Sequence, residues 1–210
     1  MAGTITALKA QKRARGRVDV HLDGEVAFSV ALIHALWLKI GQALSDDEIA
    51  SLRAADTLEQ AKQRVVGLLE FRPRSVREVQ QRLKRAGVDE ATIEQVVDQL
   101  KAAGMLDDTA FAAAWVESRL RANPRGKRML AWELRQKGAD PQAIEASLAG
   151  VDDTEAALTA ARRRVPRLAA LPAPERRRKL IEYLARNGFA FAIIEDVLGK
   201  LDLAADDAVE

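Results

Sequence analysis

Three stretches of the chain share one pattern of apolar residues, and a glycine closes each at Gly87, Gly138 and Gly188. These glycines stand 51 and 50 residues apart. Leucine, isoleucine and valine recur at the same offsets, and the later ones step by four and then three residues, which places them on one face of a helix. A period shared by three copies indicates tandem helical units. The matching residues are Leu83, Leu134 and Leu184; Ile93, Ile144 and Ile194; and Val97, Leu148 and Leu198.

Each unit contains three predicted helices. The glycine is typical of the left-handed residue that ends a helix, and here it closes the second one. Proline-containing segments at 72–75, 123–126 and 171–174 separate first from second helices. We expect first helices at 57–70, 108–122 and 153–168, second helices at 75–86, 126–137 and 174–187, and third helices at 89–103, 141–149 and 190–201.

The first 56 residues follow a different pattern. Apolar and polar residues alternate on both sides of Asp23-Gly24, which predicts a β-hairpin with a tight turn, and residues 5–9 fit a third strand. A helix is expected near 30–38, and Ser45-Asp46-Asp47-Glu48 is a capping box that opens another. So small a sheet is marginal alone, and we expect it to pack against its own helices or the first repeat.

The patterns predict a mainly α protein in four parts. An N-terminal β-hairpin with helices occupies 1–56, and three-helix repeats occupy 57–107, 108–152 and 153–210. Aromatic residues make up only 4% of the chain, which favours Ala- and Leu-rich helices over a large β protein. One helical face per unit has too few partners, so helices must pack both within and between repeats.

Composition excludes several classes of function. The chain has no cysteine, which removes disulfides, thiol catalysis and cysteine-based metal sites. No apolar run approaches the ~18 residues of a membrane span, and the first residues lack a signal-peptide pattern. We therefore expect a cytoplasmic protein that does not bind membranes.

Common enzyme motifs are also missing from the sequence, including Walker A, Gly-x-Gly-x-x-Gly, His-Glu-x-x-His and Gly-x-Ser-x-Gly. The pairs Asp107-Asp108 and Asp152-Asp153 offer carboxylates to a divalent cation, as a nuclease would require. Adjacent residues at a helix start do not converge on one point, however, so helix capping is the favoured interpretation. We expect no enzymatic activity, no cofactor and no metal.

Aromatic residues leave two interpretations open. Trp115, Trp132 and Tyr183 offer surfaces for base stacking. Phe111 lies four residues before Trp115, and Arg119 four after it, and this spacing favours packing in the core.

Basic residues recur at the start of every second helix. The positive end of the helix dipole disfavours cations there, so repeating this choice suggests a functional interpretation. Ordinary solubility charge paired with nearby Glu and Asp is the alternative, and the residues alone do not favour either. In regularly stacked repeats these residues would form a stripe suited to a phosphate backbone or to an acidic groove on a protein. The run Arg162-Arg163-Arg164 is either a solvated face or another phosphate contact. The candidate contact residues are Arg72, Arg74, Arg77, Arg125, Lys127, Arg128, Arg177 and Arg178.

These residues together resemble the bacterial RecX family of regulatory proteins. The resemblance spans about 4–201. It rests on Arg74-Ser75-x-x-Glu78 with Leu83 and Gly87; Leu106-Asp107-Asp108 continuing to Phe111-Ala112, Trp115 and Arg119; Gly126 with Glu133-Leu134 and Gly138; and the hairpin leading to Leu38-x-x-Gly41-Gln42-x-Leu44. Val79 departs from the leucine that the family often has there.

The resemblance implies an elongated, curved array of three repeats that modulates RecA without enzymatic chemistry. It implies binding in the groove of the RecA–DNA filament, lower ATPase, strand-exchange and co-protease activities, and a role in DNA repair, recombination and the SOS response. The expected partner is the RecA nucleoprotein filament, with single- or double-stranded DNA as a further partner, and we expect a monomer. The alternative is a direct DNA-binding module in which the three-helix units act as repeated helix-turn-helix elements.

Overall fold

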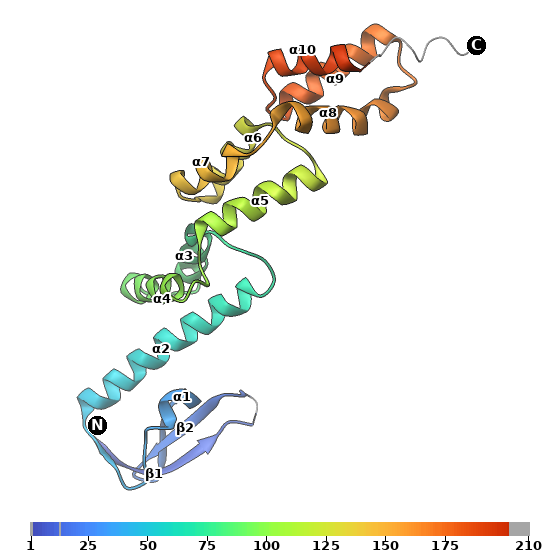
Figure 1. The fold of residues 1–210 in the computed structure, drawn as a ribbon. Coiled ribbons are helices and arrows are strands. Elements are labelled where there is room, and N and C mark those ends of the chain that lie inside the picture. The colour runs from blue at the N-terminus through green and yellow to red at the C-terminus, as the bar shows by residue number, and fades with distance from the viewer. Residues whose placement is uncertain (1, 13, 202–210) are drawn as a thin grey trace. The chain divides into compact units, whose positions relative to one another are not determined.

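The computed structural model describes residues 2–12 and 14–201 and is mainly helical (Figure 1). It divides into two compact units. Of the described residues, the first unit holds 2–12, 14–72 and 79–105, and the second holds 73–78 and 106–201. The predicted fold class, a small N-terminal β segment followed by three-helix repeats, is confirmed.

The first unit begins with an antiparallel sheet in the order β3-β2-β1-β4. Its strands are β1 (Gly3–Ala10), β2 (Arg17–Leu22), β3 (Glu25–Ala31) and the two-residue β4 (Ala43–Leu44). The hairpin and the third strand are confirmed, with Asp23 at φ 51° and Gly24 at φ 95° in the turn. The pairing of β4 with β1 was not predicted, because two residues carry no readable alternation.

The helices that follow the sheet differ from the prediction in two ways. Helix α1 (Leu32–Ala35) is much shorter than the expected 30–38. The helix opening at the capping box and the helix expected at 57–70 are one continuous helix, α2 (Asp46–Leu69). The capping box of Ser45 and Glu48 is confirmed. The next 24 residues contain no proline, so the helix continues to Leu69 without a break.

Asp56 of α2 fastens the helix to the sheet. Its carboxylate accepts hydrogen bonds from Arg17 at 2.9 and 3.1 Å, from the backbone N–H of Ala31 at 2.7 Å and from Gln60 at 2.7 Å. Burial raises the pKa of Asp56, but the bonds from Arg17, Gln60 and Ala31 outweigh it and leave the pKa below its ordinary value. The sheet therefore packs on α2, which contains both the helix expected after the capping box and the first helix of the first repeat.

The first repeat is completed by α3 (Val76–Arg85) and α4 (Glu90–Ala102). Helix α4 packs against α2, and Asp89 caps its start by accepting from the Thr92 N–H at 2.9 Å. Burial of one apolar face drives this packing, at about 1.5–3 kcal/mol for each large side chain. The buried residues of α4 are Ile93, Val96, Val97 and Leu100.

The second unit holds the other two repeats. The second repeat is α5 (Asp108–Ala122), α6 (Lys127–Lys137) and α7 (Pro141–Ala149). Each lies within a residue or two of its predicted range. Its core includes Phe111 and Leu130.

The third repeat is α8 (Asp153–Arg164), α9 (Ala173–Arg186) and α10 (Phe191–Lys200). The end of its predicted first helix is instead a 3₁₀ turn, η1 (Val165–Leu168), because Pro166 cannot donate the α-helical hydrogen bond. None of the helices in the described chain combines the length and apolarity that a membrane span requires.

Candidate functional site

The start of the second helix, where the candidate basic residues lie, is hydrogen-bonded to the end of the second helix of the next repeat. We call this contact between repeats the joint. The Ser75 hydroxyl donates to the Lys137 carbonyl at 2.6 Å, and the Gly126 N–H, 51 residues later, donates to the Asn187 carbonyl at 3.0 Å. Each bond runs from one repeat to the residue just before the closing glycine of the next. Two successive junctions within the second unit therefore use the same geometry.

The acidic pairs take part in the same joint. Asp107 and Asp152 accept from the N–H of Thr109 and Thr154 in their own helices. Their neighbours reach the preceding repeat: Asp108 accepts from the Val76 N–H at 2.9 Å, and Asp153 accepts from the Lys127 N–H at 2.8 Å. The capping interpretation is confirmed, and it extends to the helices that carry the basic residues. A carboxylate at a helix start offsets the repulsion between the dipole and nearby cations.

The closing glycines serve the joint as well as the helix end. Gly87, Gly138 and Gly188 have φ of 77°, 72° and 88°, which confirms the predicted left-handed caps. A Cβ on Gly138 would lie 2.6 Å from the Cβ of Arg77, and one on Gly188 would lie 2.8 Å from the backbone nitrogen of Met129. Gly87 has nothing within 4 Å of that position. Only the two glycines at a junction therefore need the absence of a side chain as well as a positive φ.

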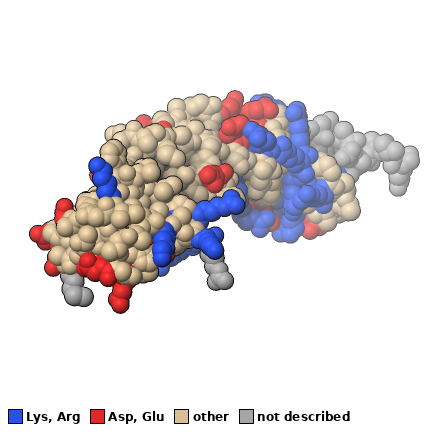
Figure 2. All heavy atoms as spheres, turned by 90° about the horizontal axis from the view of Figure 1, so that it is seen from below, with Lys and Arg blue, Asp and Glu red and all other residues tan. Residues whose placement is uncertain are grey.

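Four of the predicted contact residues are exposed. Arg77 and Arg128 make no ion pair within the described part of the chain. Arg177 pairs with Glu195 at 3.0 Å, and Arg178 lies 3.8 Å from Glu175, yet half or more of each arginine side chain stays exposed. Figure 2 shows Lys and Arg gathered on the face of the second unit that this view presents.

The remaining four predicted residues are more enclosed. Arg72, Arg74, Arg125 and Lys127 are half-buried. The Nε of Arg74 is buried without a hydrogen-bond partner among the described residues. The backbone of Lys127 belongs to the joint through Asp153. These positions are therefore less open to a partner than Arg77 and Arg128.

Arg125 belongs to a network inside the second repeat. The carboxylate of Glu133, only 7% exposed, accepts from Trp115 Nε1 at 2.9 Å, from Arg119 Nε at 2.8 Å and from the Arg125 guanidinium. Arg119 and Lys137 lie over the Trp115 ring at 4.4 and 5.1 Å from its centroid. Trp115 packs against the core, as its spacing predicted, and Arg125 has an internal counter-ion.

Two arginines with internal structural roles were missed by reasoning from the sequence. Arg176 stands in the basic run that opens α9, yet it is 2% exposed. Arg163 donates to the carbonyls of Arg121 and Ala122 at 3.0 and 3.2 Å, so it caps the end of α5 while remaining exposed. A run of arginines gives no signal of which member turns inward. Among the described residues, no cluster of three or more His, Asp or Glu side chains could hold a metal ion.

Comparison with known families accounts for most of the chain. The model of the RecX N-terminal domain matches residues 3–45. The models of the first, second and third three-helix domains of RecX match residues 61–100, 107–148 and 152–198. The fold and its repeated helices thus define a protein built from RecX domains throughout.

Individual relatives agree with this. A regulatory protein RecX of Bacillus licheniformis is 32% identical over 98% of this chain and 80% of its own length. The RecX of Bacillus subtilis is 29% identical over the same shares. A crystal structure of a regulatory protein RecX aligns with TM-score 0.76 and 27% identity over 94% of this chain and 99% of that one. The chain belongs to the RecX family of regulatory proteins, and this membership supports a role in regulating RecA.

A further crystal structure shares the fold. RecX from Lactobacillus salivarius aligns with TM-score 0.63 at 22% identity, over 71% of this chain and 99% of that one.

Proposed function

We propose that this protein binds the RecA nucleoprotein filament and lowers its ATPase, strand-exchange and co-protease activities by binding alone. The observation that carries the proposal is an exposed arginine near the start of the second helix in each repeat, in the first turn of α3 and α6 and in the second turn of α9. Arg77, Arg128 and Arg178 occupy equivalent positions, 51 and 50 residues apart, and all three are exposed. RecX membership supplies the partner.

The joint explains how Arg77 and Arg128 are maintained at helix starts, where the helix dipole disfavours cations. Asp108 and Asp153 each cap the helix start beside an arginine, so backbone donors are satisfied internally and the guanidinium groups remain available. One exposed ion pair is worth only about 0–1 kcal/mol. Several equivalent contacts on linked repeats add their effects, and a filament of identical subunits offers equivalent contacts in series.

Inhibition without chemistry follows from differential binding. A ligand shifts an equilibrium between filament states by the difference in its affinity for them. If the arginines bind acidic side chains or DNA phosphates of one filament state more tightly, that state accumulates and turnover falls. This mechanism needs neither a cofactor nor a catalytic group on the inhibitor.

The test is the double variant Arg77→Glu with Arg128→Glu. The stem of Arg77 packs on Gly138 through its carbons, and glutamate retains Cβ, Cγ and Cδ, so the melting temperature should stay near that of the wild type. The concentration needed to inhibit the RecA ATPase should rise at least about tenfold, since the variant removes two ion pairs of about 1 kcal/mol each. Arg135→Glu, an exposed arginine in the last turn of α6, is the control and should inhibit normally. Full inhibition by the double variant would contradict the proposal.

A direct DNA-binding module is the second candidate, because Arg77 and Arg128 have no carboxylate partner in the described chain and so suit phosphates. Direct phosphate binding gives an affinity for bare DNA that falls linearly on a logarithmic salt scale, with or without RecA. Titration of labelled DNA at several salt concentrations distinguishes the two candidates. Tight, salt-sensitive binding without any effect on RecA would favour this alternative.

A further inference from the structure

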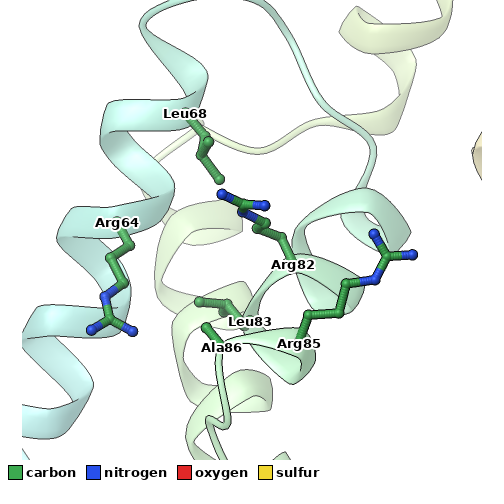
Figure 3. Close-up of a pocket in the computed structure, with 6 residues that line it drawn as sticks. All are labelled: Arg64, Leu68, Arg82, Leu83, Arg85 and Ala86. Atoms are coloured by element: carbon green, nitrogen blue, oxygen red, sulfur yellow. The ribbon is translucent and has the colours of Figure 1, made fainter.

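A basic hollow lies in the first unit, between α2 and α3. Its volume is about 440 Å³, and the described residues that line it include three arginines and no acid. Figure 3 shows Arg82 reaching toward α2 beside Leu68, Arg64 running along α2, and Arg85 pointing away from α2. The apolar part of the lining is Leu68, Leu83 and Ala86.

The three arginines have no counter-ion among the residues that the structure describes. Arg64, Arg82 and Arg85 are exposed, and none lies within 4 Å of a carboxylate in the described part of the chain. Arg82 and Arg85 stand in the last turn of α3, where the helix dipole favours cations. That effect does not account for Arg64, which comes from another helix and lines the same hollow. Like charges gathered around one space repel each other unless an anion enters it.

In the second repeat, the positions equivalent to the lining of this hollow include a carboxylate that balances the positive charge. Arg82 stands 51 residues before Glu133, Arg64 stands 51 before Trp115, and Leu68 stands 51 before Arg119. In the second repeat, the buried carboxylate of Glu133 binds both Trp115 and Arg119. In the first repeat an arginine replaces that carboxylate. The second repeat therefore carries its own anion, and the hollow of the first has none among the described residues that line it.

We propose that this hollow binds a phosphodiester of single-stranded DNA. Guanidinium groups donate paired hydrogen bonds to phosphate oxygens, and the exposed arginines can turn their forks toward one such group. The volume falls in the ~300–1,000 Å³ range of small-ligand sites. It exceeds what a lone phosphate needs, and Leu68 and Ala86, which are not fully buried, provide an apolar surface for the attached sugar or base. The site uses other residues than the arginines proposed to contact the filament, and it does not depend on that proposal.

Binding of a fluorescein-labelled oligothymidylate to the full chain, followed by anisotropy at several salt concentrations without RecA, tests the site. Arg64→Gln with Arg82→Gln should weaken binding at least tenfold at low salt. The slope of log affinity against log salt should become shallower by about 0.7, the contribution of the one phosphate that loses its arginine partners. Lys84→Gln is the matched control. Lys84 is exposed on the same turn of α3, pairs with Glu90 at 3.6 Å and does not line the hollow. Wild-type affinity and slope in the double variant would overturn the proposal.

A second variant separates loss of the site from loss of the fold. Arg82→Glu places a carboxylate at the position where the second repeat has Glu133. This carboxylate balances the positive charge of Arg64 in the hollow. This variant should lose oligonucleotide binding as fully as the double variant, with a melting temperature no lower than that of the wild type. Retained binding would overturn the proposal.

Free anions provide the last arm of the test. Inorganic phosphate and ATP, at constant ionic strength, should raise the melting temperature of the wild type less than the oligonucleotide does. Equal stabilisation by inorganic phosphate would overturn the assignment to a DNA strand. Because RecA is absent from every arm, failure here is distinct from failure of the proposed regulation of RecA.

Discussion

The buried carboxylate of the second repeat gives a sharp prediction about stability. Glu133→Gln preserves the shape of the side chain and one carbonyl acceptor but removes the charge. The acceptor can still serve Trp115, but Arg119 and Arg125 lose their counter-ion, and the new amide NH₂ faces a guanidinium that has no acceptor to offer. The change therefore weakens two charge-assisted hydrogen bonds at once.

The geometry of the network sets the size of the effect. Removing one partner of a fully buried ion pair costs about 3–5 kcal/mol. Here the arginine side chains are 34% and 26% exposed, so water replaces part of what they lose. A hydrogen bond to a charged group contributes about 1.5–3 kcal/mol against about 1 for a neutral one, so two weakened bonds give a loss of about 2 kcal/mol. For a unit of this size, that is a fall of about 8 °C in the melting temperature.

Thermal unfolding followed by circular dichroism at neutral pH measures this loss. Trp115→Phe serves as a comparison that leaves the charge of Glu133 and both arginine bonds in place. It removes one hydrogen bond to the carboxylate, worth about 1.5–3 kcal/mol, and part of the ring under Arg119 and Lys137. Arg125→Gln should destabilise about as much as Glu133→Gln if Arg125 acts inside the repeat. A Glu133→Gln variant that melts within ~1 °C of the wild type would refute the structural role given to this network.

Two further predictions concern Asp56, which binds the N-terminal sheet, and the glycines that close the second helices. Because hydrogen bonding leaves the pKa of Asp56 below its unfolded value, its contribution to stability is complete above the unfolded pKa of ~3.9 and is lost as pH falls through the folded pKa. Melting curves from neutral pH to about pH 3 should show this loss of stability. The Asp56→Asn variant should be less stable at neutral pH and should lose less stability on acidification. An acid profile in the variant identical to that of the wild type would contradict this role of Asp56. Gly87→Ala should cost about 1–2 kcal/mol for its positive φ alone. Gly188→Ala should cost clearly more, because the added Cβ meets the Met129 backbone, and equal melting temperatures for the two variants would count against the repeated joint.

Local patterns made much of this fold predictable. The repeat period, the glycine at the end of each second helix and the Ser45–Glu48 capping box depend on residues close in sequence, and the structure confirms them. The continuous helix α2 was not predicted, because the repeat period places a boundary at residue 57 within the helix that the capping box opens. Only a breaker between them would have ended the helix, and the sequence has none there.

The candidate site was less predictable because its contacts join distant residues. The sequence marks Asp108 and Asp153 as helix caps, but not that each caps the helix of the preceding repeat. It marks Arg125 as a basic residue, but not that buried Glu133 binds it. One signal was available: aligning the repeats at an offset of 51 sets Arg82 against Glu133, a reversal of charge at one position.

The most direct test of the central claim is a titration of the single-stranded-DNA-dependent ATPase of RecA with this protein, repeated in excess DNA with the Arg64→Gln, Arg82→Gln variant. A regulator that binds the filament should inhibit at amounts well below one molecule per RecA, and added DNA should not restore hydrolysis. An unchanged ATPase, or one that recovers in proportion to the added DNA, would contradict regulation through the filament.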